Sequence, residues 1–207
     1  MSLTVRAYTD FRSPYTYVAK AEAYSWEEDF GVTLDWWPYT TPLQEVFGPA
    51  DGRNEREFRK IKYMYMNVRR IGAEQGLTIR GTKRIFDPTP AHVGLLQAKD
   101  DGRFRMFHDY VFERVFLREL DPDDADHVRA ALKAVDCDVA AYDTRLPDGT
   151  EELQSINKRA EEEHGVFGVP SFVVDGELYW GYGYAPSDQE KVDPAYSLIN
   201  GKAQIGS

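Results

Sequence analysis

The chain has 207 residues, of which 42% are apolar, 29% charged and 14% aromatic, as is typical of one soluble globular domain rather than a disordered chain. No apolar run approaches the roughly 20 residues of a membrane-spanning helix, and the first residues lack the basic and apolar stretches of a secretory signal. The net charge of -10 disfavours binding to nucleic acid or an anionic membrane, and the single cysteine, Cys137, cannot close an intramolecular disulfide. We therefore expect a cytoplasmic protein without two-cysteine redox chemistry in one chain.

The first forty residues predict a parallel β-α-β unit. Residues 3–8 alternate as a strand whose odd-numbered residues form one apolar face. Ser13 is a candidate helix N-cap because Pro14 follows it at the first helical position, and Gly31 marks the end of that helix. Residues 32–36 alternate again, so strand, helix and strand form a right-handed crossover.

The middle of the chain is helical in pattern. Turn residues separate the periodic segments, and the apolar stripe at Phe104, Phe107, Val111 and Val115 is typical of a core-facing helix. Five helices are predicted there: Phe58–Gln75, Pro90–Lys99, Phe104–Glu119, Asp124–Val135 and Thr150–Glu163.

Charge is concentrated at the start of this helical part. The segment 53–84 contains ten basic and three acidic residues, a local charge of +7 that leaves -17 for the rest of the chain. A solvated helix face accounts for such a cluster as well as a functional site does. The functional alternative is a basic wall that binds a small anionic ligand.

Strand patterns return near the end of the chain. Residues 171–174 and 177–180 predict two strands joined by the two-residue turn Asp175-Gly176. Two prolines and a poor apolar stripe disfavour a closing helix over 187–199. The expected fold is α/β: a thioredoxin-like domain formed by residues 1–43 and 165–207, interrupted by a large α-helical insertion domain at 44–164.

Two segments carry candidate chemistry. The helix start at Ser13 exposes the backbone amides of Tyr15 and Thr16 with partial positive charge, which stabilise an anion such as a thiolate, and the serine hydroxyl adds one more donor. The stretch 165–181 contains Val169–Pro170 directly before a strand. Taken separately, the two segments are an ordinary helix start and an ordinary loop. In a thioredoxin-like fold, however, they meet at one end of the sheet.

Three matches resemble the DsbA-like family that contains 2-hydroxychromene-2-carboxylate isomerases and kappa-class glutathione transferases. Ser-Pro-Tyr-Thr-Tyr at 13–17 resembles the helix start of that family, and Gly165 to Gly181 is nearly identical to its C-terminal signature. The run Lys60 to Met64 is a weaker third match, with Arg70 and Gly76 following at the family's spacing.

The resemblance implies a glutathione site. Ser13 is the implied catalytic residue, whose hydroxyl holds the glutathione sulfur as a thiolate. Pro170 is implied to be cis, with the Val169 backbone pairing with the cysteinyl backbone of glutathione. Asn54 and Lys60 are further implied glutathione contacts, with Lys62 as the alternative lysine.

The resemblance also implies a reaction and a partner. The leading hypothesis is a glutathione-dependent isomerase of an aromatic carboxylate, in which Lys60, Lys62 and Arg70 hold the carboxylate of a small anionic substrate and the protein is a homodimer. A kappa-like transferase is the near alternative. The third hypothesis is a non-catalytic thioredoxin-like binding module, because Tyr182-Gly183-Tyr184 replaces residues with which relatives bind the γ-glutamyl end.

Two other kinds of chemistry are not expected. Relatives with disulfide activity carry Cys-x-x-Cys where this chain has Ser13 and Thr16, so cysteine redox chemistry is missing at the expected position. The four histidines are too dispersed along the sequence for a typical ligand set, so we expect no metal site.

Overall fold

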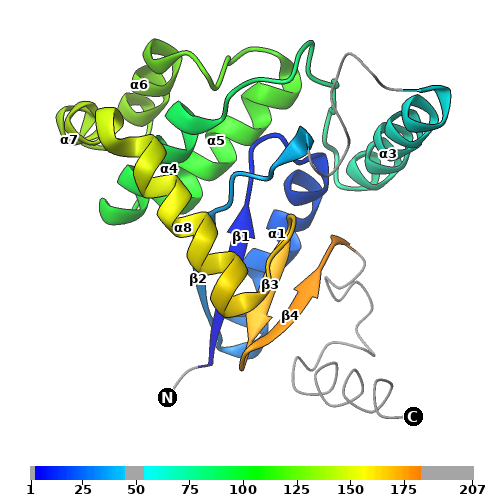
Figure 1. Cartoon of the computed structure of the whole chain (residues 1–207), viewed down its shortest axis with the longest axis horizontal. Helices are drawn as coiled ribbons and strands as arrows, with labels where there is room; N and C mark the ends of the chain where they lie inside the picture. The colour runs from blue at the N-terminus through cyan, green and yellow to red at the C-terminus, as the bar shows by residue number, and fades with distance from the viewer. Residues whose placement is uncertain (1–2, 45–53, 183–207) are drawn as a thin grey trace.

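The computed structural model describes residues 3–44 and 54–182, and within them a four-stranded mixed sheet is surrounded by helices (Figure 1). The strand order is β2-β1-β3-β4; β1 and β2 are parallel, whereas β3 is antiparallel to both β1 and β4. The strands are β1 (Thr4–Thr9), β2 (Thr33–Pro38), β3 (Ser171–Val174) and β4 (Glu177–Trp180). Both the predicted β-α-β unit and the predicted terminal hairpin are therefore confirmed.

Helix α1 (Pro14–Phe30) begins and ends where the sequence predicts. Ser13 is the N-cap, with Pro14 in the first turn, and Gly31 ends the helix in the left-handed conformation at φ 63°. Glycine adopts this conformation without a steric penalty, which makes it a common helix terminator.

Strand β1 differs from the prediction in its burial, because both of its faces are covered. Val5 and Ala7 pack in a cluster with Trp26 of α1. Tyr8 faces the other side, where it packs in a cluster with Ala160 of α8 (Gly149–His164). The prediction of one apolar face was incomplete because helices separated by more than a hundred residues cover the two sides of the sheet.

All five predicted helices of the middle segment are present, with ends shifted by at most three residues. They are α3 (Glu55–Glu74), α4 (Thr89–Asp100), α5 (Phe104–Leu117), α6 (Ala125–Ala134) and α8. The sequence analysis missed α7 (Val139–Arg145), a short helix whose N-cap Asp138 accepts a hydrogen bond from the Ala141 amide, and the 3-10 turn η2 (Leu146–Asp148) that follows it.

A single core joins the helical part to α1. The predicted stripe on α5 is confirmed, with Phe107, Val111 and Val115 buried. Tyr17 of α1 stacks on Phe112 and Phe116 of α5, with ring centroids 5.5 and 5.1 Å away. Since Phe11 and Tyr17 belong to the same apolar cluster as the buried residues of α4 and α5, the chain around Ser13 is anchored from both parts. The exact limits 1–43, 44–164 and 165–207 stay a prediction.

In the described ranges, no helix is both long enough and apolar enough to cross a membrane. The segment 187–199 and the residues Gly183 and Tyr184 lie outside the described residues.

Candidate functional site at the start of the first helix

Ser13 lies where β1 gives way to α1. Its Oγ accepts a hydrogen bond from the Thr16 amide at 3.1 Å, and its own amide donates to the Asp10 carbonyl at 2.9 Å. The Thr16 amide is thus occupied by Ser13 itself. Pro14 has no N–H, so the Tyr15 amide is the first-turn donor that neither the helix nor the cap engages. One of the two amides that the sequence analysis assigned to an anion is therefore engaged in capping.

The loop before β3 faces this helix start. The Val169–Pro170 peptide bond is cis, as the resemblance implies. The Ser13 hydroxyl donates to the Val169 carbonyl at 3.4 Å, so residues 156 positions apart in the sequence are in direct contact. Two hydrogen bonds hold the loop: Ser171 Oγ donates to the Gly168 carbonyl at 2.6 Å, and the Gly181 amide donates to the Pro170 carbonyl at 2.9 Å.

A buried ion pair supports the turn that carries Ser13. The Asp10 carboxylate, 1% exposed, accepts hydrogen bonds from the Arg12 amide and guanidinium and from the Thr41 amide. Burial alone would raise the pKa of Asp10, but the Arg12 charge, the neighbouring His92 side chain and the hydrogen bonds from Arg12 outweigh it and hold that pKa below its ordinary value. The sequence analysis missed this network, for which the local Asp-x-Arg spacing was the available signal.

His92 lies beside this carboxylate but carries no compensating positive charge at neutral pH. Its Nε2 is 3.6 Å from Asp10, and its Nδ1 forms a hydrogen bond of 2.9 Å with the Thr40 hydroxyl. Complete burial lowers the pKa of His92 to about 4, although the neighbouring carboxylate acts in the opposite direction. His92 is therefore neutral at physiological pH and serves as a polar part of the core.

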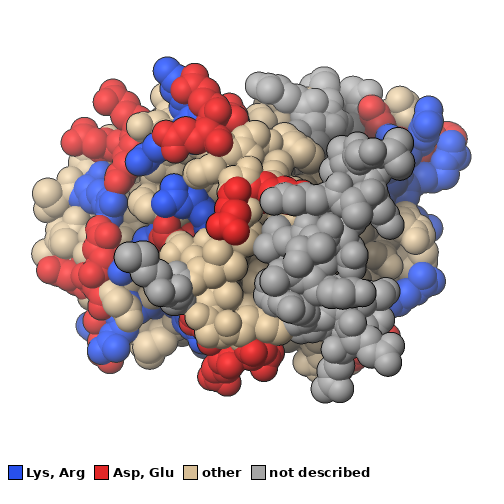
Figure 2. All heavy atoms as spheres, turned by 90° about the horizontal axis from the view of Figure 1, so that it is seen from below, with Lys and Arg blue, Asp and Glu red and all other residues tan. Residues whose placement is uncertain are grey.

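Helix α3 carries the remaining predicted site residues. Asn54 is its N-cap and forms a capping box with Glu57, so its side-chain oxygen is engaged by backbone amides. Lys60, Lys62 and Arg70 are exposed, and none of them forms an ion pair within the described part of the chain. In Figure 2, basic side chains gather at the right-hand edge, where Figure 1 places α3.

These three cations do not share one face of α3. Successive residues of an α-helix are rotated by about 100°, so Lys60 and Lys62 point to nearly opposite flanks, with Arg70 between them on the outer side. Asn67 lies about two turns after Lys60 on the same flank, and its amide donates to the Tyr15 hydroxyl at 3.2 Å. Lys60 is therefore the cation on the flank that contacts the start of α1.

Two aromatic rings flank the cis-proline loop. Phe167 and Trp180 are 53% and 48% exposed, and their ring centroids are 5.0 Å apart. A side chain at Gly168 would place its Cβ 2.8 Å from the Trp180 indole nitrogen, so glycine is required for the indole to lie against this loop. Both aromatics belong to the 165–181 stretch, but the sequence analysis assigned them no role.

Other reactive groups are remote from this arrangement. Burial and nearby Asp101 raise the pKa of Cys137 to about 11, so this thiol is protonated at neutral pH. Among the described residues, no three histidine, cysteine, aspartate or glutamate side chains gather as metal ligands. The Ser13 hydroxyl and the Tyr15 amide are the polar groups that the first turn of α1 offers to a ligand.

The fold and the site together define the class. A β-α-β unit, an antiparallel hairpin and a cis-proline loop facing the first helix are the parts of a thioredoxin-like protein. The chain belongs to the family of the DSBA-like thioredoxin domain, whose model matches residues 4–187.

Similar proteins include isomerases. A 2-hydroxychromene-2-carboxylate isomerase from Sphingobium xenophagum is 27% identical over 186 residues, covering 87% of this chain and 93% of that protein. The solved structure of 2-hydroxychromene-2-carboxylate isomerase (HCCA isomerase) has a TM-score of 0.73 at 20% identity and covers 99% of this chain and 100% of its own. The structure of cytosolic disulfide reductase DsbM from Pseudomonas aeruginosa with GSH has a TM-score of 0.64 at 12% identity, covering 98% and 100%. The two structures support the fold, and the curated relative indicates an enzyme of the isomerase kind.

Proposed function

We propose that this protein is a glutathione-dependent isomerase of an aromatic carboxylate, with a reaction like that of 2-hydroxychromene-2-carboxylate isomerase. The observation that carries the proposal is the contact of the Ser13 hydroxyl with the Val169 carbonyl at 3.4 Å, at the N-terminus of α1. A tripeptide thiol at this point would touch the helix start through its sulfur and the cis-proline loop through its backbone.

The residues present fit glutathione. The Ser13–Val169 bond is long for a hydroxyl donor, whose bonds are usually nearer 2.8 Å, so the hydroxyl can turn toward an incoming sulfur at little cost. The Tyr15 amide, which has no acceptor within the described ranges, and the positive end of α1 favour the anionic sulfur over the thiol. The Val169 backbone can pair with an extended peptide in the manner of an added strand.

When bound, glutathione would supply a thiolate whose electron pair adds to an unsaturated substrate carbon and returns to sulfur when the bond breaks, so the reaction consumes neither oxidant nor reductant. Ser13 would donate a hydrogen bond to the sulfur and keep its proton, while the Tyr15 amide at the start of α1 would stabilise the negative charge. The ion pair of Asp10 and Arg12 fixes the turn in which Ser13 lies, which limits the reorganisation that binding requires.

Lys60 is the favoured group for the substrate carboxylate or a glutathione carboxylate. It lies on the flank of α3 that bonds to Tyr15 through Asn67, whereas Lys62 and Arg70 point elsewhere. Asn54 lies at the N-terminal end of α3, six residues before Lys60. Its side-chain oxygen is used for capping, which leaves its side-chain amide nitrogen for a ligand. The homodimer and the cytoplasmic location belong to this proposal as further expectations.

A turnover assay tests the proposal. The protein is incubated with 2-hydroxychromene-2-carboxylate in the presence and absence of glutathione, and both product and free thiol are quantified. We expect isomerised product only with glutathione, and full recovery of the thiol. Replacing Ser13→Ala should lower kcat/KM by about a hundredfold, the typical effect of removing one donor to a developing anion.

The matched control is Ser25→Ala, because Ser25 lies on the same helix and its hydroxyl donates to the Glu22 carbonyl at 3.0 Å within that helix. Equal loss in both variants, or turnover independent of glutathione, would refute the isomerase proposal. Stoichiometric loss of free thiol into a conjugate would identify a kappa-like transferase. Binding of glutathione without any turnover would favour the non-catalytic module.

A further inference from the structure

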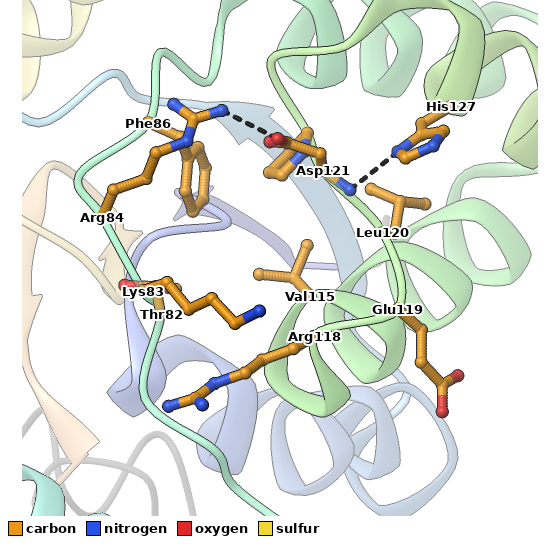
Figure 3. A pocket seen from close by; sticks show the side chains of 11 residues that line it. Thr82, Lys83, Arg84, Phe86, Val115, Arg118, Glu119, Leu120, Asp121 and His127 are labelled. Atoms are coloured by element: carbon orange, nitrogen blue, oxygen red, sulfur yellow. Dashed lines mark hydrogen bonds and ion pairs between the residues drawn. The ribbon is translucent and has the colours of Figure 1, made fainter.

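A second site candidate lies on the helical part of the protein, between the segment 82–86 and the end of α5. It is a cavity of about 290 Å³. Figure 3 shows it between the irregular segment 82–86 on one side and the turn between α5 and α6 on the other. Its lining contains neither Ser13, Val169 nor Lys60, so it is separate in composition from the proposed glutathione site.

The walls of this cavity are tied to each other. The Arg84 guanidinium bonds Asp121 at 2.8 Å and Asp123 at 2.5 Å, which joins the segment 82–86 to the turn after α5. Closer to α5, two further bonds join the same walls: the Arg80 amide donates to the Phe116 carbonyl at 2.8 Å, and Arg118 Nε donates to the Gly81 carbonyl at 2.7 Å. Since these bonds span both walls, the cavity exists before any ligand binds.

The floor of the cavity is apolar. Phe86 and Val115 are 5% and 3% exposed, and both belong to the large apolar cluster of the molecule. Leu120 adds a half-buried aliphatic wall. A flat ring of about six carbons matches both this floor and the volume, which lies near the lower limit of ordinary small-molecule sites.

The rim of the cavity carries two cations that the protein does not neutralise. Lys83 has no hydrogen bond or ion pair within the described ranges, and the Arg118 guanidinium forms no ion pair there. Arg84 differs from them, because two carboxylates already balance its charge. In Figure 3, the Glu119 carboxylate lies on the opposite side of the hollow from the charged ends of Lys83 and Arg118.

We propose that this cavity binds a small aromatic carboxylate, with the ring on Phe86 and Val115 and the carboxylate between Lys83 and Arg118. An apolar floor alone would take any small hydrophobic molecule, whereas two unbalanced cations at the rim select an anion. Among the described residues, Arg118 uses only Nε, which donates to the Gly81 carbonyl, so its terminal guanidinium nitrogens are available there. The site does not depend on glutathione or on turnover.

The test is a titration of isotope-labelled full-length protein with benzoate, followed through the backbone amide signals, with uncharged benzamide in parallel. We expect saturable shifts at residues 82–86 and 118–121, with a millimolar or lower dissociation constant for benzoate and about tenfold weaker binding of benzamide. Ser13→Ala should retain benzoate binding, which separates this site from the proposed glutathione site.

Charge variants decide whether the two cations act. The double variant Lys83→Gln with Arg118→Gln should weaken benzoate binding about tenfold or more. The matched control is Lys133→Gln with Lys158→Gln, which removes the same charge from exposed positions of the same helical part. Because Arg118 also holds Gly81, Lys83→Glu serves as the variant that leaves the walls intact, and it should abolish binding. Equal binding by the rim and control variants, equal binding of benzamide, or no saturable shift at these amides would overturn the proposal.

Discussion

The buried carboxylate of Asp10 offers a quantitative test of how the turn before Ser13 is held. Replacing Asp10→Ala removes the acceptor of the Arg12 guanidinium, whose side chain is only 12% exposed, and of the Thr41 amide. Breaking a buried pair in this way costs about 3–5 kcal/mol because the remaining charge loses its partner. At about 2–4 °C per kcal/mol for a chain of this size, the melting temperature should fall by roughly 6–20 °C.

Thermal unfolding followed by circular dichroism measures this change. The control is Glu55→Ala, which removes the exposed pair with Arg59, where side chains 72% and 90% exposed meet at 3.4 Å and the expected cost is about 0–1 kcal/mol. Because the folded pKa of Asp10 lies below its ordinary 3.8, its stabilisation is complete above that pH and disappears as the pH falls through the lower, folded value. An Asp10→Ala protein that melts within about 2 °C of the control would refute the reasoning.

Three further predictions concern the rest of the molecule. Unfolding should become easier as pH falls from 6.5 to about 4, by up to about 3 kcal/mol, because His92 takes up a proton only when unfolded; a flat profile in urea titrations would contradict this. Gly94→Ala should destabilise by about 1–3 kcal/mol, since its Cβ would lie 2.8 Å from Phe107 and Val128, and an unchanged melting temperature would disprove that crowding. Tyr15→Phe and Asn67→Ala should show a coupling of about 1 kcal/mol in a double-mutant cycle, and additive losses would show that their bond contributes nothing.

Local sequence signals were sufficient for the elements that frame the site. Ser13 before Pro14 predicts a helix start because each residue favours its position for its own local reason. The terminal hairpin follows equally from Asp175-Gly176 between two apolar runs. The cis bond at Pro170 came only from the family resemblance, since nothing in an isolated Val-Pro pair indicates it.

Features that depend on long-range packing could not be predicted in the same way. Asp10 and His92 are 82 positions apart, and only the folded chain shows that they meet in one buried network. The basic segment 53–84 was counted as one wall, but helical periodicity directs Lys60 and Lys62 to different flanks, and Arg84 is bound by acidic residues of a distant turn. Strand β1 is covered on its second face by α8, which no local alternation can reveal.

The most direct test of the account is the ionisation of glutathione at Ser13. Ultraviolet difference spectra of the protein with glutathione at neutral pH report the thiolate band, and Ser13→Ala should remain folded because loss of an N-cap costs only about 1 kcal/mol. We expect a thiolate signal with the wild-type protein and with Ser25→Ala, and a strongly reduced signal with Ser13→Ala. The absence of that signal in the wild-type protein, or a signal of equal size in all three proteins, would contradict the proposed role of Ser13.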